Sequence, residues 1–276
     1  MYDYALGLYE KAMPDDLPLT EKLLTARELG YDYMELCVDM NPQRAARLDW
    51  TPDQRHELTE FLFRNGLHLT TLSMSVLRRC PLGERAENVP LFMDTMRKGI
   101  DLACDLGAHV ILFNGYDTYS TPSTPETRQR FYDNLPAAVA MAAKRGIILA
   151  LENAEKQFMD SIAKAAACVD RVDSPYLRVY GDIANTANAM KGDADLAMAD
   201  IGAGRGRLAA VHLKDSLPGD YRFTPYGKGH VDFTRSVDLC KQLGVRIYTA
   251  ELFLRPDVTD YKAEAAQVCK FLRSYF

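Results

Sequence analysis

The stretch "LAAVHL", residues 208–213, is a short apolar run with a histidine, His212, next to its end, and Lys214 and Asp215 follow it directly. An apolar run of this length is typical of a strand buried on both faces of a parallel sheet. The pattern recurs in "IILALE" (147–152), "LRVYGD" (177–182) and "RIYTAEL" (246–252), which carry an acidic residue at or next to the strand end. The spacing between these strands is about that of one βα unit.

The rest of the chain continues this alternation. Four earlier runs read as strands: "YALGLY" (4–9), "YMELC" (33–37), "LHLTTLSM" (67–74) and "HVILFNG" (109–115). Amphipathic segments lie between them. One of these begins at Pro52 after Thr51 as N-cap and ends near Gly66, and another ends at Gly107. A third, ending near Gly146, contains Pro136, which should bend or break it.

Eight strands, each followed by a helix, predict an α/β fold: a (β/α)8 TIM barrel forming a single domain over residues 1–276. The competing fold is a doubly wound open sheet, which often carries a phosphate-binding glycine loop after its first strand. "LYEKAMP" follows the first strand here and contains no glycine. "GAGRGR" (202–207) precedes a strand, so we interpret it as a turn from helix to strand.

Composition limits the partners and the compartment. The chain has 276 residues, 47% of them hydrophobic, and a formal net charge of −5. This charge gives no electrostatic reason to expect a nucleic-acid partner. The N-terminal segment has no basic stretch followed by a long apolar run, and no apolar run is long enough to span a membrane. The six cysteines are scattered without a C-x-x-C pair, so we expect reduced thiols in a cytoplasmic protein.

The four strand-end residues Glu152, Asp182, His212 and Glu251 suggest a metal site. Every second residue of a barrel strand points inward, so four successive strands would direct these side chains to one point above the core. Three carboxylates this close would repel one another unless a cation lies among them. Oxygen-rich ligation with one imidazole suits Mn²⁺, Mg²⁺, Co²⁺ or Zn²⁺. The alternative is that each residue only caps its own strand and faces solvent.

Several motifs resemble the pentulose-5-phosphate 3-epimerases of the L-ribulose or L-xylulose 5-phosphate type, which belong to the xylose-isomerase-like barrel superfamily. The motifs are "GLYEKAMP", "LDW", "CPLGE", "GYD", "MDSIAKA", "GDIAN", "VHLKDSLPG" and "PYGKGHVDF", in order from the first strand onward. The resemblance implies that Glu152, Asp182, His212 and Glu251 bind the metal. It also implies that Glu152 and Glu251 form the catalytic acid/base pair, that the substrate is a sugar phosphate and that the protein forms a homodimer.

The residue types fit this chemistry. Inverting a carbinol carbon beside a ketone requires removal of a proton from one face and return of a proton to the other. Two opposed carboxylates can do this while a metal polarises the carbonyl and stabilises the enediolate. Two positions depart from the family pattern. "ENAEK" (152–156) carries Asn153, Glu155 and Lys156 where the family usually has a hydrophobic pair and an aspartate, and Asn185 stands where tagatose-type epimerases have a histidine.

Candidate substrate-binding residues follow strands, each with a plainer alternative. Lys228 lies between two glycines, where it could bind a phosphate or form a solvated turn, and Arg78 with Arg79 could supply the phosphate clamp instead or face solvent. Lys214 could neutralise the carboxylates. Glu35 could bind a sugar hydroxyl or the free nitrogen of a metal-bound histidine, or be structural. Tyr9 could cover the substrate or pack internally, and Asn185 is the remaining candidate.

The other four histidines, at 56, 68, 109 and 230, receive no catalytic role. Three alternative functions stay open: an epimerase or isomerase of unphosphorylated ketoses, a barrel nuclease, and an inactive sugar-binding barrel. A nuclease would need more metal ligands and a basic face, which the acidic composition disfavours.

Overall fold

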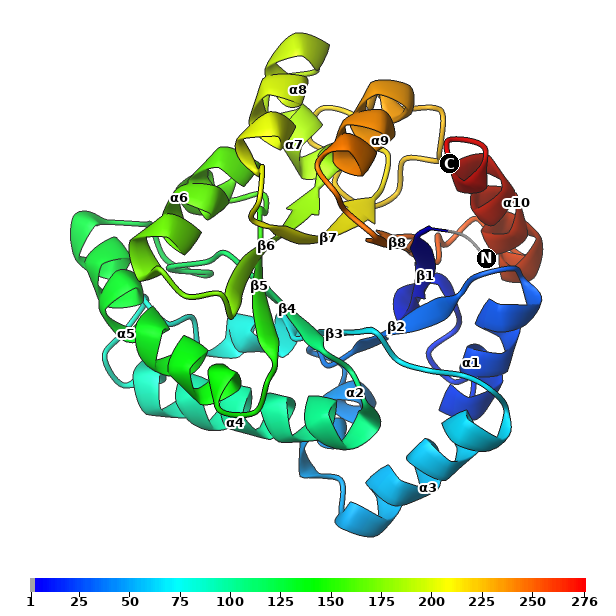
Figure 1. Cartoon of the computed structure of the whole chain (residues 1–276), viewed down its shortest axis with the longest axis horizontal. Helices are drawn as coiled ribbons and strands as arrows, with labels where there is room; N and C mark the ends of the chain where they lie inside the picture. The colour runs from blue at the N-terminus through cyan, green and yellow to red at the C-terminus, as the bar shows by residue number, and fades with distance from the viewer. Residues whose placement is uncertain (1–2) are drawn as a thin grey trace.

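The computed structural model, which describes residues 3–276, contains eight parallel strands that close into one barrel (Figure 1). Each strand pairs with the next, and β8 pairs with β1. The predicted barrel is therefore confirmed. The strands are β1 (Ala5–Tyr9), β2 (Tyr33–Cys37), β3 (Thr71–Ser73), β4 (Val110–Asn114), β5 (Ile148–Glu152), β6 (Leu177–Asp182), β7 (Leu208–Leu213) and β8 (Ile247–Ala250).

The helices form a ring around the barrel (Figure 1). The α-helices are α1 (Leu19–Glu28), α2 (Pro42–Ala45), α3 (Pro52–Arg64), α4 (Asn88–Leu106), α5 (Pro125–Ala143), α6 (Ile162–Val172), α7 (Ile183–Ala189), α8 (Ala194–Ala203), α9 (Phe233–Gln242) and α10 (Tyr261–Arg273). Short 3-10 helices are η1 (Glu10–Ala12), η2 (Ala46–Asp49), η3 (Ser75–Arg79) and η4 (Gln157–Met159).

The helix signals in the sequence act as expected, with one exception. Thr51 caps α3 in a capping box with Gln54, and Gly107 ends α4 with φ 77°. Helix α5 continues through Pro136, so of the two predicted effects, a bend or a break, the break does not occur. A proline inside a helix removes one backbone hydrogen bond, and the apolar face of α5, including the buried Leu135 and Val139, packs against the core on both sides of that point.

Five strands are shorter than predicted, and β3 and β8 lose the most residues. β3 covers only Thr71–Ser73, because its pairing with β2 involves only Leu72 and Ser73. β8 ends at Ala250, one residue before Glu251. The Glu251 N–H still donates to the Leu213 carbonyl at 3.0 Å, which ties this residue to β7.

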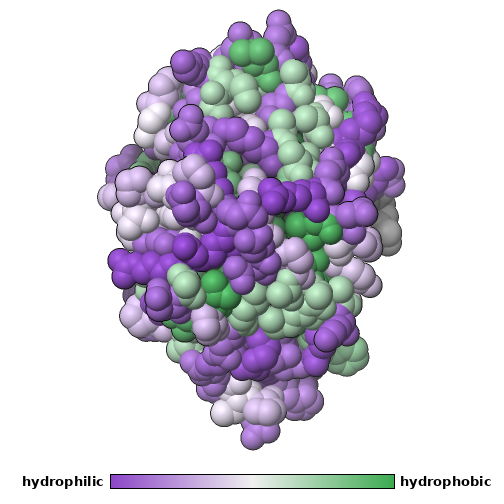
Figure 2. Space-filling view, turned by 90° about the vertical axis from the view of Figure 1, so that its left-hand side faces the viewer, coloured by the Kyte–Doolittle hydropathy of each residue, from purple (hydrophilic) through white to green (hydrophobic). Residues whose placement is uncertain are grey.

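Apolar side chains fill the barrel interior and the layer between strands and helices. Val110, Leu112, Ala150, Tyr180 and Ala210 form the inner cluster, so the predicted inward positions on β5, β6 and β7 are confirmed. The outer faces of the helices are mostly polar, and Figure 2 shows apolar residues only as separate patches on one side of the molecule. Across residues 3–276, no helix combines the length and apolar character that crossing a bilayer requires.

Candidate active site and metal centre

Glu152, Asp182, His212 and Glu251 converge at the carboxyl ends of four neighbouring strands. Glu152 and Asp182 are the last residues of β5 and β6, His212 lies near the end of β7, and Glu251 follows β8. One potential ligand atom from each side chain lies within 4.8 Å of the others, and all four side chains are buried. The strand-end pattern of the sequence therefore marks one site in space.

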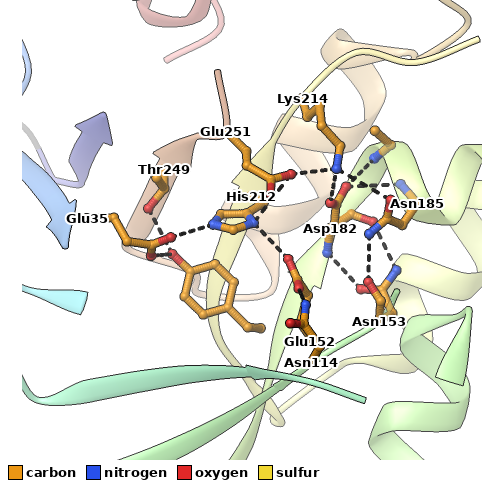
Figure 3. A network of polar contacts seen from close by, with 12 residues as sticks. Glu35, Asn114, Glu152, Asn153, Asp182, Asn185, His212, Lys214, Thr249 and Glu251 are labelled. Atoms are coloured by element: carbon orange, nitrogen blue, oxygen red, sulfur yellow. Dashed lines mark hydrogen bonds and ion pairs between the residues drawn. The ribbon is translucent and has the colours of Figure 1, made fainter. Parts of the chain in front are cut away.

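His212 lies at the centre of this cluster (Figure 3). Its Nδ1 is 2.9 Å from Glu152 Oε1 and 3.8 Å from Glu251 Oε2, and its Nε2 is 2.8 Å from Glu35 Oε1. Burial would lower the pKa of His212, but the charges of Glu35 and Glu251 and hydrogen bonds to Glu152 and Glu35 raise it well above 6.5. Without a metal, the imidazole is therefore a cation held among carboxylates.

Lys214 supplies a second cation from the same strand end. Its Nζ donates to Asp182 Oδ2 at 2.7 Å and to Glu251 Oε2 at 2.5 Å. Burial would lower the pKa of Lys214, but the charges of Asp182 and Glu251 raise it above its ordinary value. The pKa of Asp182 is raised by burial and by the charge of Glu251, against the opposing effect of Lys214. These two contacts are those that Lys214 would need in order to neutralise the carboxylates, as the sequence suggests.

The residues present fit a divalent metal. Asp182 Oδ1 accepts the backbone N–H groups of Ala184 and Asn185, which orients the carboxylate and leaves Oδ2 toward the cluster. The cluster together with Glu35 holds two more carboxylates than cations. Three carboxylates and one imidazole form a donor set suited to Mn²⁺, Co²⁺ or Zn²⁺ and compatible with Mg²⁺. A metal on His212 Nδ1 would replace the second proton of the imidazole, and a divalent ion would then offset two of the three excess negative charges.

A cavity of about 360 Å³ opens above the cluster. A neighbouring cavity of about 490 Å³ shares Lys11, Ser75, Arg78, Arg222, Phe223 and Phe253 with it. The first cavity has an acidic floor and cations on the side that adjoins the second. Its lining includes Tyr9, Lys11, Ser73, Ser75, Arg78, Asn114, Glu152, Glu155, Asn185, His212, Lys214, Tyr221, Arg222, Glu251 and Phe253.

Four of the six predicted substrate-binding residues line this cavity: Tyr9, Arg78, Asn185 and Lys214. Tyr9 packs its ring edge-on against His212, with centroids 5.8 Å apart. The Arg78 guanidinium lies over the rings of Tyr116 and Tyr119, 5.4 Å from each centroid. Its neighbour Arg79 is exposed and bonds to Met40.

The other two, Glu35 and Lys228, do not line the cavity. Glu35 is fully buried beneath His212, which leaves it no surface for a sugar hydroxyl but fulfils the alternative contact with the histidine. Lys228 is exposed on the loop after β7. The backbone N–H groups of Gly227 and Gly229 point instead at Asp215 Oδ2, each at 2.8 Å, so they are not available to a phosphate.

The residues of the "ENAEK" segment lie in different places. Asn153 is buried and links β5 to β6 by accepting the Asp182 N–H at 2.7 Å. Glu155 lines the cavity and accepts a hydrogen bond from Tyr116 at 2.5 Å. Lys156 is exposed outside the cavity. Of the remaining histidines, His230 bonds the buried Ser216 at 3.1 Å, which fits a structural role.

Sequence reasoning missed several cavity residues, among them the polar or charged Asn114, Lys11 and Arg222. Asn114 ends β4, so the same strand-end pattern could have found it; its Nδ2 donates to Glu152 Oε2. Lys11 and Arg222 come from loops far apart in the sequence, and no local signal joins them. Arg78 Nε and Asn114 Oδ1 are two of the three buried side-chain atoms within residues 3–276 that have no hydrogen-bond partner. Because both residues line the cavity, a bound ligand could supply these partners.

Comparisons with known proteins agree on fold and family. The family model described as "Xylose isomerase-like TIM barrel" matches residues 23–275. The chain is 36% identical over 271 residues to L-ribulose-5-phosphate 3-epimerase UlaE of Shigella flexneri, covering 98% of this chain and 94% of that protein. It is 38% identical over 240 residues to the protein of the same name from Escherichia coli O139:H28 (strain E24377A / ETEC), covering 87% and 83%.

Solved structures show the same fold at lower sequence identity. An L-ribulose 3-epimerase superimposes with a TM-score of 0.81 at 18% identity, covering 99% of this chain and 95% of that one. D-psicose 3-epimerase from Clostridium cellulolyticum H10, solved with D-tagatose, superimposes with a TM-score of 0.82 at 16% identity, covering 98% and 99%. At these identities the likeness establishes the barrel fold.

Proposed function

The chain belongs to the xylose isomerase-like TIM barrel family, and on that premise we propose that it is a metal-dependent epimerase that inverts C3 of a ketopentose 5-phosphate. The relatives place the chain among sugar epimerases, which are isomerases. The proposed substrates are L-ribulose 5-phosphate and L-xylulose 5-phosphate. The observation that carries the proposal is a pair of glutamates, Glu152 and Glu251, that line one cavity within a cluster suited to a divalent cation.

The two glutamates have the placement that a two-base epimerisation needs. Glu152 and Glu251 come from strands on different sides of His212, and only 4% and 8% of their surfaces are exposed. In the proposed reaction, one carboxylate removes the proton from C3 and the other, protonated, delivers a proton to the opposite face. Asn114 holds Glu152, and Lys214 holds Glu251, so both carboxylates are fixed before substrate binds.

The proposed metal would be held by Glu152, Asp182, His212 and Glu251. When bound, it would supply Lewis acidity toward the ketone and neighbouring hydroxyl of the sugar. The side chains that close the site above these ligands are aromatic: Tyr9 and Phe253 pack edge-on, with ring centroids 5.4 Å apart. Their contact helps to exclude water from the reacting carbon.

The phosphate is proposed to bind where the two cavities meet. Lys11, Arg78 and Arg222 all line both cavities, which gives this region three cations. Arg78 is the best-placed of these because its Nε is buried without a partner and its ring contacts with Tyr116 and Tyr119 hold the guanidinium in place. Arg78 and Lys11 therefore replace Lys228 as the proposed phosphate ligands.

The phosphate assignment predicts a substrate-dependent loss of activity. An Arg78→Met variant should lose roughly 10- to 100-fold in kcat/KM for L-ribulose 5-phosphate, because a charge-assisted hydrogen bond contributes about 1.5–3 kcal/mol. Its kcat/KM for free L-ribulose should change little. The exposed Arg79→Met is the matched control and should resemble the wild type. Equal wild-type efficiency on both sugars would contradict the phosphate assignment and point to an epimerase of free ketoses.

The two-base mechanism is tested by hydrogen exchange in D₂O. The wild-type enzyme should incorporate solvent deuterium at C3 while interconverting the two epimers. Glu152→Gln and Glu251→Gln should each lose about 10²- to 10⁴-fold in epimerisation, the usual contribution of one acid/base group. A Glu60→Gln variant, altered on the exposed face of α3, should keep full activity. Epimerisation without deuterium incorporation would rule out proton transfer at this carbon.

A further inference from the structure

Glu35 is a fully buried carboxylate that lies below the proposed metal site and outside the cavity. It is on β2, on the far side of His212 from the other carboxylates (Figure 3). Its Oε1 is 2.8 Å from His212 Nε2. A buried carboxylate is costly unless its charge and lone pairs are satisfied, so this position calls for an explanation.

The second oxygen of Glu35 is also fully engaged. Thr71 Oγ1 donates to Oε2 at 2.6 Å, and the Tyr180 hydroxyl donates to the same atom at 2.8 Å. The Tyr180 ring packs against the imidazole of His212, with centroids 4.6 Å apart. Three elements, β3, β6 and β7, thus hold the carboxylate in one position against the histidine.

This arrangement determines which nitrogen of His212 faces the cluster. Nε2 is directed at Glu35, and Nδ1 is directed at Glu152 and Glu251. A ring flipped about its Cβ–Cγ bond would turn ring carbons toward Glu35 and Glu152 and would lose both hydrogen bonds. When a metal displaces the Nδ1 proton of the cationic imidazole, this contact keeps the remaining proton on Nε2 and leaves the lone pair of Nδ1 for the metal.

We propose that Glu35 is a positioning residue that holds His212 with Nδ1 toward the metal and, through its negative charge, strengthens that nitrogen as a ligand. The inference rests on the proposed metal-dependent function. Glu35 would thereby increase the affinity for the metal although it touches neither the metal nor the substrate. A carboxylate behind a ligating histidine raises the basicity of the ligand, and removing such a partner typically costs about 10- to 100-fold in metal affinity.

Glu35→Gln tests the charge with little change of shape. The amide oxygen can still accept the hydrogen bond from His212, and Tyr180 can donate to Thr249, 2.8 Å away, in place of Glu35. The expected result is Zn²⁺ binding about 10- to 100-fold weaker than wild type, measured by competition with a chromophoric chelator in the absence of sugar. Thr71→Val is the matched control, because it removes one neutral hydrogen bond from the same carboxylate and should bind Zn²⁺ within a few-fold of wild type.

A spectroscopic measurement separates this role from a purely structural one. In the Zn²⁺-loaded wild type labelled with ¹⁵N-histidine, the His212 ring should carry its proton on Nε2 and the metal on Nδ1; the His212→Asn spectrum identifies the signal. Glu35→Gln should weaken or broaden this Nε2–H signal. If Glu35→Gln does not fold, Glu35→Asp, whose shorter side chain draws the charge away from Nε2, should weaken Zn²⁺ binding to a similar degree.

The outcomes separate the inference from the proposed function. Zn²⁺ binding by Glu35→Gln or a folded Glu35→Asp at wild-type affinity, with an unchanged Nε2–H signal, would overturn the role of Glu35 and leave the epimerase proposal standing. A wild-type protein that binds no Zn²⁺ would overturn the metal site and this inference together. A wild type that binds Zn²⁺ but does not act on pentulose phosphates would refute only the proposed function.

Discussion

Lys214 acts as an internal counter-ion at the proposed metal site. It is buried at the edge of the cavity and joins Asp182 to Glu251, two carboxylates that would otherwise repel each other. The removal of one partner from a buried ion pair leaves an uncompensated charge, which is costly. A divalent ion at the same carboxylates would provide the missing positive charge.

This reasoning predicts opposite responses of Lys214→Met in the absence and presence of metal. Without metal, the variant should be destabilised by about 3 kcal/mol, the usual cost of breaking a buried pair. Saturating Mn²⁺ or Zn²⁺ should stabilise the variant more than it stabilises the wild type. Urea unfolding with and without the metal measures both effects. Lys98→Met, which breaks a surface pair with Asp49, is the control and should change stability by less than about 1 kcal/mol. Equal metal stabilisation of Lys214→Met and wild type would contradict the counter-ion role.

The sequence predicts most of the site residues that are positioned by a single strand. Glu152, Asp182 and His212 follow from strand length and alternation, because adjacent parallel strands share a register. Asn114 has the same signal and was overlooked. Lys11 and Arg222 could not be found, since they meet only through loops whose conformation depends on tertiary packing.

At the scale of elements, Asp39 joins the segments that follow β1 and β2. It accepts from Arg44 Nε at 2.9 Å and pairs with Lys11 at 2.7 Å, and Lys11 lines the proposed phosphate region. Burial would raise the pKa of Asp39, but the hydrogen bond from Arg44 and the charge of Lys11 lower it to about 2. The carboxylate therefore stabilises the fold only while it is ionised.

The pH dependence of this contribution has a definite sign. The folded-state pKa is about 2 and the ordinary value is 3.8, so the unfolded chain binds the proton more readily. The stabilisation is complete above about pH 4 and is lost as the pH falls toward 2. Asp39→Asn should therefore lower the free energy of unfolding by about 2 kcal/mol at pH 7, and its gap from wild type should narrow below pH 4.

Urea titrations at pH 7, 4 and 3 measure this gap. The exposed Asp238→Asn is the control and should unfold at the same urea concentration as wild type at each pH. A gap that stayed constant from pH 7 to pH 3 would show that the effect of the substitution does not come from the ionisation of Asp39.

The helices and strands were largely predictable from the sequence, and the predictions that failed did so for physical reasons. β2, β6 and β7 begin and end where the sequence predicts, because each is a mostly apolar run of strand length, although each also carries a charged residue or a histidine. Of the two roles considered for Lys228, the phosphate role depended on two flanking glycines, which resemble an anion-binding loop. The structure instead uses the backbone of that loop to hold the buried Asp215.

At the scale of the whole molecule, the proposed metal site links four neighbouring strands of the barrel at their carboxyl ends. Its ligands come from β5, β6, β7 and the residue after β8, while β1 closes the barrel against β8. The homodimer that the family resemblance implies stays a prediction, as does the cytoplasmic location. The stability of the barrel offers a direct test of the metal site that needs no substrate.

Metal binding should raise the melting temperature of the entire protein. An ion that binds only the folded state stabilises it by about 4 kcal/mol when its free concentration is 1,000 times Kd. For a chain of this size, that corresponds to a rise in Tm of roughly 10 °C over the chelated protein. Calorimetry of chelated and reloaded protein measures this shift, and chelation should abolish epimerisation reversibly.

Substitution of one proposed metal ligand tests whether this rise in Tm comes from metal bound at the cluster. Asp182→Asn keeps the size of the side chain but loses the charge on Oδ2, so its Tm should respond weakly to metal, whereas the distant His56→Asn on α3 should respond like wild type. A chelated wild type that keeps both its Tm and its full turnover would contradict the metal site. In that case His212 and Lys214 would remain as the permanent cations of the cluster, and the two glutamates would have to work without a Lewis acid.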